Sequence, residues 1–168
     1  MRCFALALLF VLASSSTFAA SYQQTDGTIV DPIQSLLGGD HPYSGIDLAP
    51  LTNPRYANLD YADLGSADLN GSDLIGVTLV SANLTNAKLS STRMAETDLS
   101  NANLSNANMA AVSLYDADLT GANLTNVNLW AVLFNLAALD GADLTGADLT
   151  DAIYLGGNVP PAVDLPGK

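Results

Sequence analysis

Residues 57–156 divide into twenty blocks of five with no insertion: ANLDY ADLGS ADLNG SDLIG VTLVS ANLTN AKLSS TRMAE TDLSN ANLSN ANMAA VSLYD ADLTG ANLTN VNLWA VLFNL AALDG ADLTG ADLTD AIYLG. The third position of the block is Leu in sixteen blocks and Met, Phe or Tyr in the other four. The first position is Ala in thirteen blocks and Ser, Thr or Val in the rest. A phase held this long predicts a repeat architecture.

The five-residue period matches neither the 3.6-residue period of an α-helix nor the two-residue period of a flat strand, so either structure would scatter the Leu positions. A coil with one block per side would point the first and third positions of every block inward. The family resemblance given below implies four such sides per turn, so that residues twenty apart stack and twenty blocks make five turns. At the usual spacing between strands the coil is roughly 24 Å tall. Each turn contacts only its neighbours, so the ends of the coil need caps.

The block A-(D/N)-L-X-X resembles the signature of the pentapeptide-repeat family, and the resemblance covers residues 57–156. It implies an all-β fold, a right-handed quadrilateral β-helix of about five turns. Exported members of the family mostly have no assigned activity, and some cytoplasmic members present an acidic face that binds DNA gyrase.

The inner columns of this coil are its candidate core. Two columns consist of leucines only, and another ends in the larger rings of Phe134 and Tyr154. One of the two Leu columns contains Leu64, Leu84, Leu104, Leu124 and Leu144. The two rings at the C-terminal end have two interpretations, simple variation in packing or a widened end that meets a partner. Dimers of the family use C-terminal aromatic positions, which favours the second interpretation by analogy only.

The second position of each block is expected to face solvent. Its columns place Lys88 beside Asp68 and Arg93 beside Asp73, one turn apart. Asn residues in the column of Asp63 are expected to avoid carboxylate repulsion and to form an amide ladder. Asp98 and Asp118 form an acidic pair, which is either a solvated pair or a cation site.

One side of the coil carries large apolar residues at outward positions. The candidate interface consists of Tyr115, Trp130, Leu133, Leu136, Ile153, Tyr154 and Leu155. An exposed apolar patch of this kind usually marks a contact surface. The alternative is that the N-terminal or C-terminal segment of the same chain covers it.

Residues 1–20 have the pattern of a signal peptide, with a basic Arg2, an apolar run over 4–12 and small residues before a cleavage point after Ala19 or Ala20. The alternative, a membrane anchor, needs about 20 apolar residues, and this run is shorter. The pattern predicts an exported protein, periplasmic, lumenal or secreted, with no membrane attachment after cleavage. Cys3, the single cysteine, would leave with the signal, so no disulfide is expected.

The repeat is flanked by an N-terminal cap or lead-in over 21–56 and an extended tail over 157–168 that contains three prolines. Within the cap, residues 31–38 predict a short helix, with Asp31 as the N-cap, Pro32 in the first turn and Gly38 as the stop. Its apolar residues share one face, which is suited to covering the first turn of the coil.

The formal net charge of −12 disfavours nucleic acid and anionic membranes as direct partners. His41, the single histidine, lies in a loop without a second ligand. We therefore expect no enzyme activity, no metal site and no cofactor. The expected function is a non-catalytic exported scaffold or protein-interaction module, with a protein partner or a second copy bound through the C-terminal end or the apolar side. The alternative is an acidic DNA mimic that binds a topoisomerase such as DNA gyrase, which the signal peptide opposes.

Overall fold

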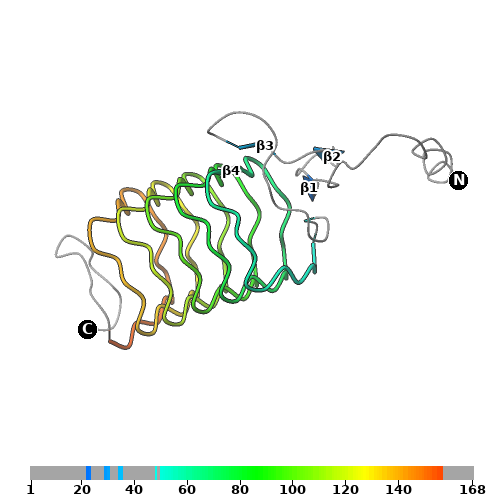
Figure 1. Cartoon of the computed structure of the whole chain (residues 1–168). Helices are drawn as coiled ribbons and strands as arrows, with labels where there is room; N and C mark the ends of the chain where they lie inside the picture. The colour runs from blue at the N-terminus through cyan, green and yellow to red at the C-terminus, as the bar shows by residue number, and fades with distance from the viewer. Residues whose placement is uncertain (1–21, 24–28, 31–33, 36–47, 49, 157–168) are drawn as a thin grey trace, which may run out of the picture.

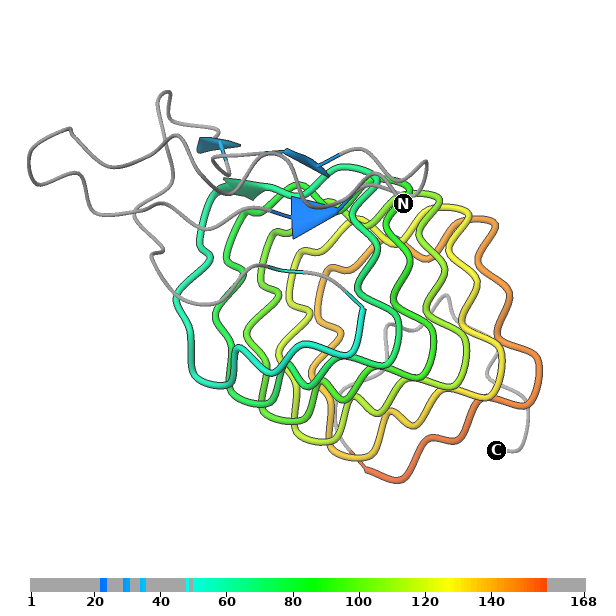
Figure 2. The same cartoon turned by 90° about the vertical axis from the view of Figure 1, so that its right-hand side faces the viewer.

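The computed structural model describes residues 22–23, 29–30, 34–35, 48 and 50–156. Residues 50–156 wind into a stack of square turns, seen from the side in Figure 1 and closer to the axis in Figure 2. Parallel β-bridges join residues twenty apart, from Asn58–Thr78 to Leu133–Ile153. Each turn therefore contains four blocks, as the family resemblance implied. We call the sides first, second, third and fourth; they begin with the blocks at residues 57, 62, 67 and 72.

Each side repeats the same three backbone hydrogen bonds between neighbouring turns. On the second side, the N–H of Leu64 donates to the carbonyl of Asn83 at 2.8 Å, and the N–H of Ser66 donates to that of Thr85 at 2.8 Å. In the opposite direction, the N–H of Asn83 donates to the carbonyl of Ala62 at 2.9 Å. The ladder satisfies backbone groups of the inward-facing blocks, which allows a chain without long strands to bury an apolar interior.

The corners of the coil are tight turns, closed by a hydrogen bond from the first residue of the next block. The N–H of Ala67 donates to the carbonyl of Leu64 at 3.0 Å, and the fifth residue of the block between them has a positive φ. This φ lies between 54° at Ala131 and 78° at Gly156 throughout the coil. A positive φ at the third residue of a hydrogen-bonded turn defines type II geometry.

The Asp or Asn at the second position of a block caps the N–H of the fourth residue of that block. Its side-chain oxygen accepts a hydrogen bond from the N–H of the fourth residue, as in Asn123 to Thr125 at 3.0 Å and Asp118 to Thr120 at 2.8 Å. Such Asx contacts stabilise a turn by satisfying a backbone donor locally. The preference for Asp and Asn in the repeat therefore has a local structural cause.

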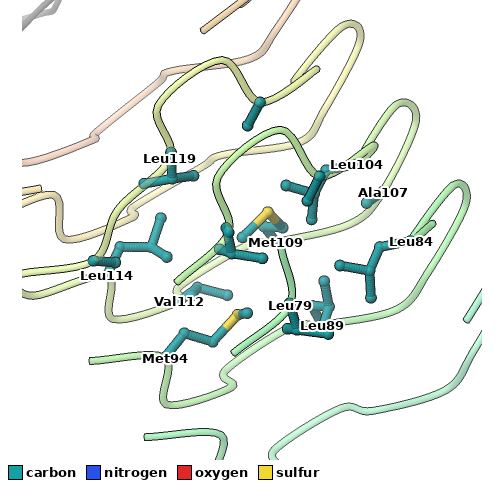
Figure 3. Packing of buried hydrophobic residues seen from close by; sticks show 14 of the residues in the cluster. Leu79, Leu84, Leu89, Met94, Leu104, Ala107, Met109, Val112, Leu114 and Leu119 are labelled. Carbon is teal, nitrogen blue, oxygen red and sulfur yellow. The ribbon is translucent and has the colours of Figure 1, made fainter. Parts of the chain in front are cut away.

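The interior is packed with the first- and third-position side chains, several of which point toward one another in Figure 3. The predicted core residues are fully buried in the first four turns, and Leu144 in the last turn is half-buried. Those fully buried are Leu64, Leu84, Leu104, Leu124 and Phe134. The buried hydroxyls of Thr92 and Thr97 donate to the carbonyls of Leu69 and Leu74, at 3.1 and 3.0 Å.

The first turn is covered by strand pairing. Strands β1 (Tyr22–Gln23) and β2 (Ile29–Val30) pair antiparallel, and β3 (Gln34–Ser35) pairs antiparallel with β4 (Ala62–Asp63) in the first turn, beside which it lies in Figure 1. The helix predicted over 31–38 is therefore wrong at β3. Its i, i+3, i+4 pattern spans only eight residues, and the unpaired edge of the first turn offers extended backbone a ladder instead.

The coil phase begins before the first block read from the sequence. Leu51 and Tyr56 already have positive φ values of 64° and 57°, and Pro54 is buried at the inner position between them. Leu48 is also fully buried against this end of the core. The predicted signal peptide, His41 and the C-terminal tail lie outside the described residues.

Candidate functional site

The predicted apolar surface is formed by the fourth side near the C-terminal end of the coil. We define the apolar patch as the outward residues Tyr115, Leu133, Leu136, Ile153 and Leu155, all of which are exposed. Leu155 is the most exposed, with 66% of its surface accessible, and Leu136 and Ile153 follow with 48% each. Among the described residues, large apolar side chains thus gather on one side of a coil whose other outward positions are mostly polar.

Backbone pairing fixes the spacing of the patch. Leu133 and Ile153 are partners in a parallel bridge, so their side chains are neighbours in consecutive turns. The Leu136 amide donates to the Leu155 carbonyl at 3.2 Å, and the Leu136 side chain covers Gly156, 3.2 Å from where a Cβ would stand. Tyr115 lies one turn before the turn that contains Leu133 and Leu136. In its column, Asn135 separates it from Leu155.

Trp130 lies at the neighbouring end of the third side and is 47% exposed. Its indole Nε1 donates to Oδ2 of Asp151 at 3.2 Å, one turn farther along the coil. The contact holds an aromatic side chain at the corner beside the patch. Trp130 was predicted as an interface residue, and the structure places it at the edge of this surface.

Tyr154, which was predicted both as an inner-column residue and as part of the candidate interface, does not belong to the exposed patch. It points inward, is half-buried, and packs against the core. Burial and the nearby negative charge of Asp140 raise the pKa of its phenol above 10.0. Its hydroxyl is buried and has no hydrogen-bond partner among the described residues.

At two positions of the apolar patch, the fourth side lacks the hydrogen bond that an Asp or Asn side chain would accept from the N–H two residues later. Asp73 in the same column accepts from the N–H of Ile75 at 3.4 Å, but Leu133 and Ile153 have no oxygen to offer the N–H groups two residues later. A capping oxygen is also lacking at this position in three other blocks, at Lys88, Arg93 and Ala138. Only Leu133 and Ile153, however, place a large exposed aliphatic side chain there. Packing within the coil does not require this, because these side chains point outward.

The basic residues of the described coil pair with aspartates. As predicted, Nη1 of Arg93 lies 2.9 Å from Oδ2 of Asp73, and Nζ of Lys88 lies 3.7 Å from Oδ2 of Asp68. Arg55 also donates a hydrogen bond to Asp73, a contact that the repeat register did not predict. The Arg55 hydrogen bond lowers the pKa of the Asp73 carboxyl below 3.8, although burial opposes the shift. These contacts lie in the N-terminal half of the coil, away from the apolar patch.

The columns of the second position behave partly as predicted. The amide of Asn83 donates to Asp63 at 2.7 Å, which is one step of the expected ladder. Other Asn oxygens in this column accept from their own blocks instead, as in Asn103 to the N–H of Ser105 at 3.1 Å. Asp98 and Asp118 are bridge partners, and each accepts hydrogen bonds within its own block.

The sequence reading missed a second exposed apolar group at the N-terminal end. Leu51 and Tyr56 are 81% and 70% exposed, and they lie over Gly71 and Gly76 of the next turn. A Cβ on Gly71 would stand 2.7 Å from the Leu51 side chain, which would then have to shift. Glycine at the fifth position was the available signal, because it marks where a preceding side chain folds over the corner.

Across the described ranges, no three His, Cys, Asp or Glu side chains are grouped so that they could hold a metal ion. The same ranges contain no helix that is long and apolar enough to cross a membrane.

Comparison with known proteins identifies the family. A family model described as pentapeptide repeats matches residues 57–94, 92–130 and 117–153. The chain belongs to the pentapeptide-repeat family, and the predicted right-handed quadrilateral β-helix is confirmed as its fold. Proteins of this family are in general non-catalytic scaffolds.

Solved structures of the family resemble this coil. A pentapeptide repeat protein from the cyanobacterium Cyanothece 51142 is 24% identical with a TM-score of 0.58, over 61% of this chain and 84% of that one. One from the thylakoid lumen of Arabidopsis thaliana is 29% identical with a TM-score of 0.48, over 68% and 76%. One from Nostoc PCC 7120 is 37% identical with a TM-score of 0.44, over 45% and 62%. The search of curated proteins gave no match.

Proposed function

We propose that this protein is a non-catalytic exported scaffold that binds another protein through the apolar patch. The observation that carries the proposal is the exposure of Leu133 and Ile153, two adjacent aliphatic side chains at outward positions where the repeat mostly places Asp or Asn. At these positions the coil loses a local hydrogen bond and gains an exposed aliphatic side chain. A partner that removes these side chains from water would offset the loss.

The composition of the patch suits a protein contact. Aromatic residues are enriched at interface cores, and a few of them carry most of the binding free energy. Tyr115 and Trp130 flank the aliphatic centre formed by Leu133 and Ile153. The patch is presented by a backbone ladder, so a partner would not have to order it on binding.

The export part of the proposal rests on the sequence of residues 1–20, with its basic start, short apolar run and small residues before Ala20. Export also weighs against the alternative of an acidic DNA mimic, because topoisomerases act on DNA in the cytoplasm. The apolar patch is a further argument against mimicry, since it interrupts the polar surface on one side of the coil.

The test compares the native size of the protein in its host with that of a patch variant. Leu133→Asn with Ile153→Asn restores the residue type that the repeat prefers, so this variant is expected to fold. Thr120→Asn with Thr145→Asn, at exposed positions on the first and second sides, is the matched control. We expect wild type and control to migrate within a larger assembly, and the patch variant to migrate as the free chain.

Migration of all three proteins as free chains would refute binding through the patch. Fractionation of the host with N-terminal sequencing tests export separately. A mature chain that begins at Ala20 or Ser21 outside the cytoplasm is the expected result. An uncleaved cytoplasmic chain would contradict export and make DNA gyrase binding the next assay.

A further inference from the structure

The charge of the coil is distributed unevenly along its axis. Residues 97–156 contain seven aspartates and no Lys, Arg, His or Glu, so this part has a formal charge of −7. The Arg and Lys side chains of the described coil lie earlier, at Arg55, Lys88 and Arg93, and they already pair with Asp73 and Asp68. The apolar patch therefore lies in the part of the coil with uncompensated negative charge.

Two of these aspartates border the patch at its corners. Asp116 occupies the left-handed corner that follows Tyr115, one turn before Leu136 in the same column. Asp151 occupies the corner between the third and fourth sides, where it accepts the hydrogen bond of Trp130. Both carboxylates are exposed. The fourth side thus presents an aliphatic and aromatic centre between two acidic corners.

This arrangement favours one class of partner over a second copy of the chain. Two copies that met through the patch would bring two regions of charge −7 together, and like charges close to an interface oppose association. A nucleic acid is opposed for the same reason. A cationic surface with an apolar centre would complement both the charge and the apolar side chains.

Resting on the proposed function, we infer that the partner of the apolar patch is a basic amphipathic protein segment. Its apolar residues contact Leu133, Leu136 and Ile153, and its Lys or Arg residues lie beside Asp116 and Asp151. Aliphatic contact supplies affinity, and the acidic border supplies selectivity and faster association.

The experiment uses the mature chain and three synthetic probes in a fluorescence titration. The first probe is a helical Leu/Lys amphipathic peptide, the second is a Leu/Glu peptide of the same pattern, and the third is polylysine of equal length. The proteins are wild type, the Leu133→Asn with Ile153→Asn variant, and Asp116→Asn with Asp151→Asn. The matched charge control is Asp143→Asn with Asp148→Asn, which removes two exposed carboxylates on other sides.

We expect the Leu/Lys peptide to bind wild type and to bind the Leu133→Asn with Ile153→Asn variant about tenfold more weakly or worse. Loss of the two bordering carboxylates is expected to weaken binding by about three- to tenfold, as for exposed ion pairs. The charge control is expected to change binding less. Added salt is expected to weaken the Leu/Lys complex, because exposed charges are screened.

Four results would overturn the inference. Equal binding of polylysine would show that charge alone suffices, and equal binding of the Leu/Glu peptide would show that charge plays no part. If the Asp143→Asn with Asp148→Asn control weakened binding of the Leu/Lys peptide as much, Asp116 and Asp151 would have no special role in binding. A dimer in sedimentation that the patch variant abolishes would make a second copy the occupant. The last two outcomes leave binding through the apolar patch intact, so they separate this inference from the proposed function.

Discussion

Replacement of Ala131 with Gly is expected to stabilise the coil, although Gly usually weakens regular structure. Ala131 lies at a corner with a φ of 54°, and Ala111 occupies the same corner one turn earlier with 56°. A left-handed conformation costs an L-residue about 1–2 kcal/mol. The extra freedom of Gly in the unfolded chain costs about 0.5–1 kcal/mol. The difference is a net gain of about 0.5–1 kcal/mol at each position, and Gly71 already occupies this corner column.

The assay is urea unfolding followed by circular dichroism, with thermal melts alongside. A gain of that size corresponds to a rise in Tm of about 2–6 °C for a domain of this length. Ala110→Gly is the control, because Ala110 precedes the corner and does not have a positive φ. It is expected to lower stability by about 0.5–1 kcal/mol. If Ala131→Gly destabilised the protein as much as Ala110→Gly does, the corner argument would be wrong.

The remaining predictions concern the core, the buried hydroxyls, pH and the patch. Leu104→Ala is expected to cost about 2–5 kcal/mol in urea unfolding, and Leu144→Ala about half as much, because Leu144 lies half-buried in the last turn. Equal costs would mean that the end of the coil is as closed as its middle. Thr97→Val is expected to change stability by less than about 1.5 kcal/mol, since the carbonyl that accepts its hydroxyl keeps a backbone partner. The folded-state pKa of Asp73 is lowered, so its stabilising contribution is present above about pH 4 and is lost as the pH falls through the folded pKa. Asp73→Asn should therefore be less stable than wild type at pH 7, and the difference should shrink as the pH falls below about 4; a difference that did not change with pH would refute the ion-pair explanation. Leu133→Asn should stay within about 1 kcal/mol of wild type, because a regained cap offsets lost apolar burial; a larger loss would show that the patch belongs to the core.

The stacking of the coil was predictable because every block repeats the same two inward positions. Leu64 and Leu84 share a column because four blocks return the chain to the same side and both residues hold the third position of their block. The pairing of Arg93 with Asp73 followed from the same arithmetic. Position in a strict repeat thus determines neighbours twenty residues away, which ordinary sequences do not allow.

Local roles within the block were harder to recognise. Asn103 was read as part of a ladder between turns, but its oxygen accepts from Ser105 in its own block. The left-handed corners were also visible in principle, because Gly, Asn, Ser and Asp recur at the fifth position. Residues such as Ala131 and Leu136 obscured that signal, since neither favours a positive φ.

The ends of the coil were not predictable from local pattern. The short segment around Gln34–Ser35 has helical spacing, yet it pairs with Ala62–Asp63 because the first turn has an open edge. That pairing depends on a strand almost thirty residues away, and an eight-residue pattern carries no information about it. Tyr154 was assigned both to an inner column and to the candidate interface, and it lies at the inner position, half-buried against the core.

Photo-crosslinking in the native host tests most directly whether the apolar patch binds another protein. A photoreactive residue replaces Leu133 in the patch in one strain and Asn103 on the exposed second side in another. If the patch binds a partner, position 133 should give a discrete crosslinked protein outside the cytoplasm, and position 103 should give no such product. The same products from both positions, or none from position 133, would contradict a protein-binding role for the apolar patch.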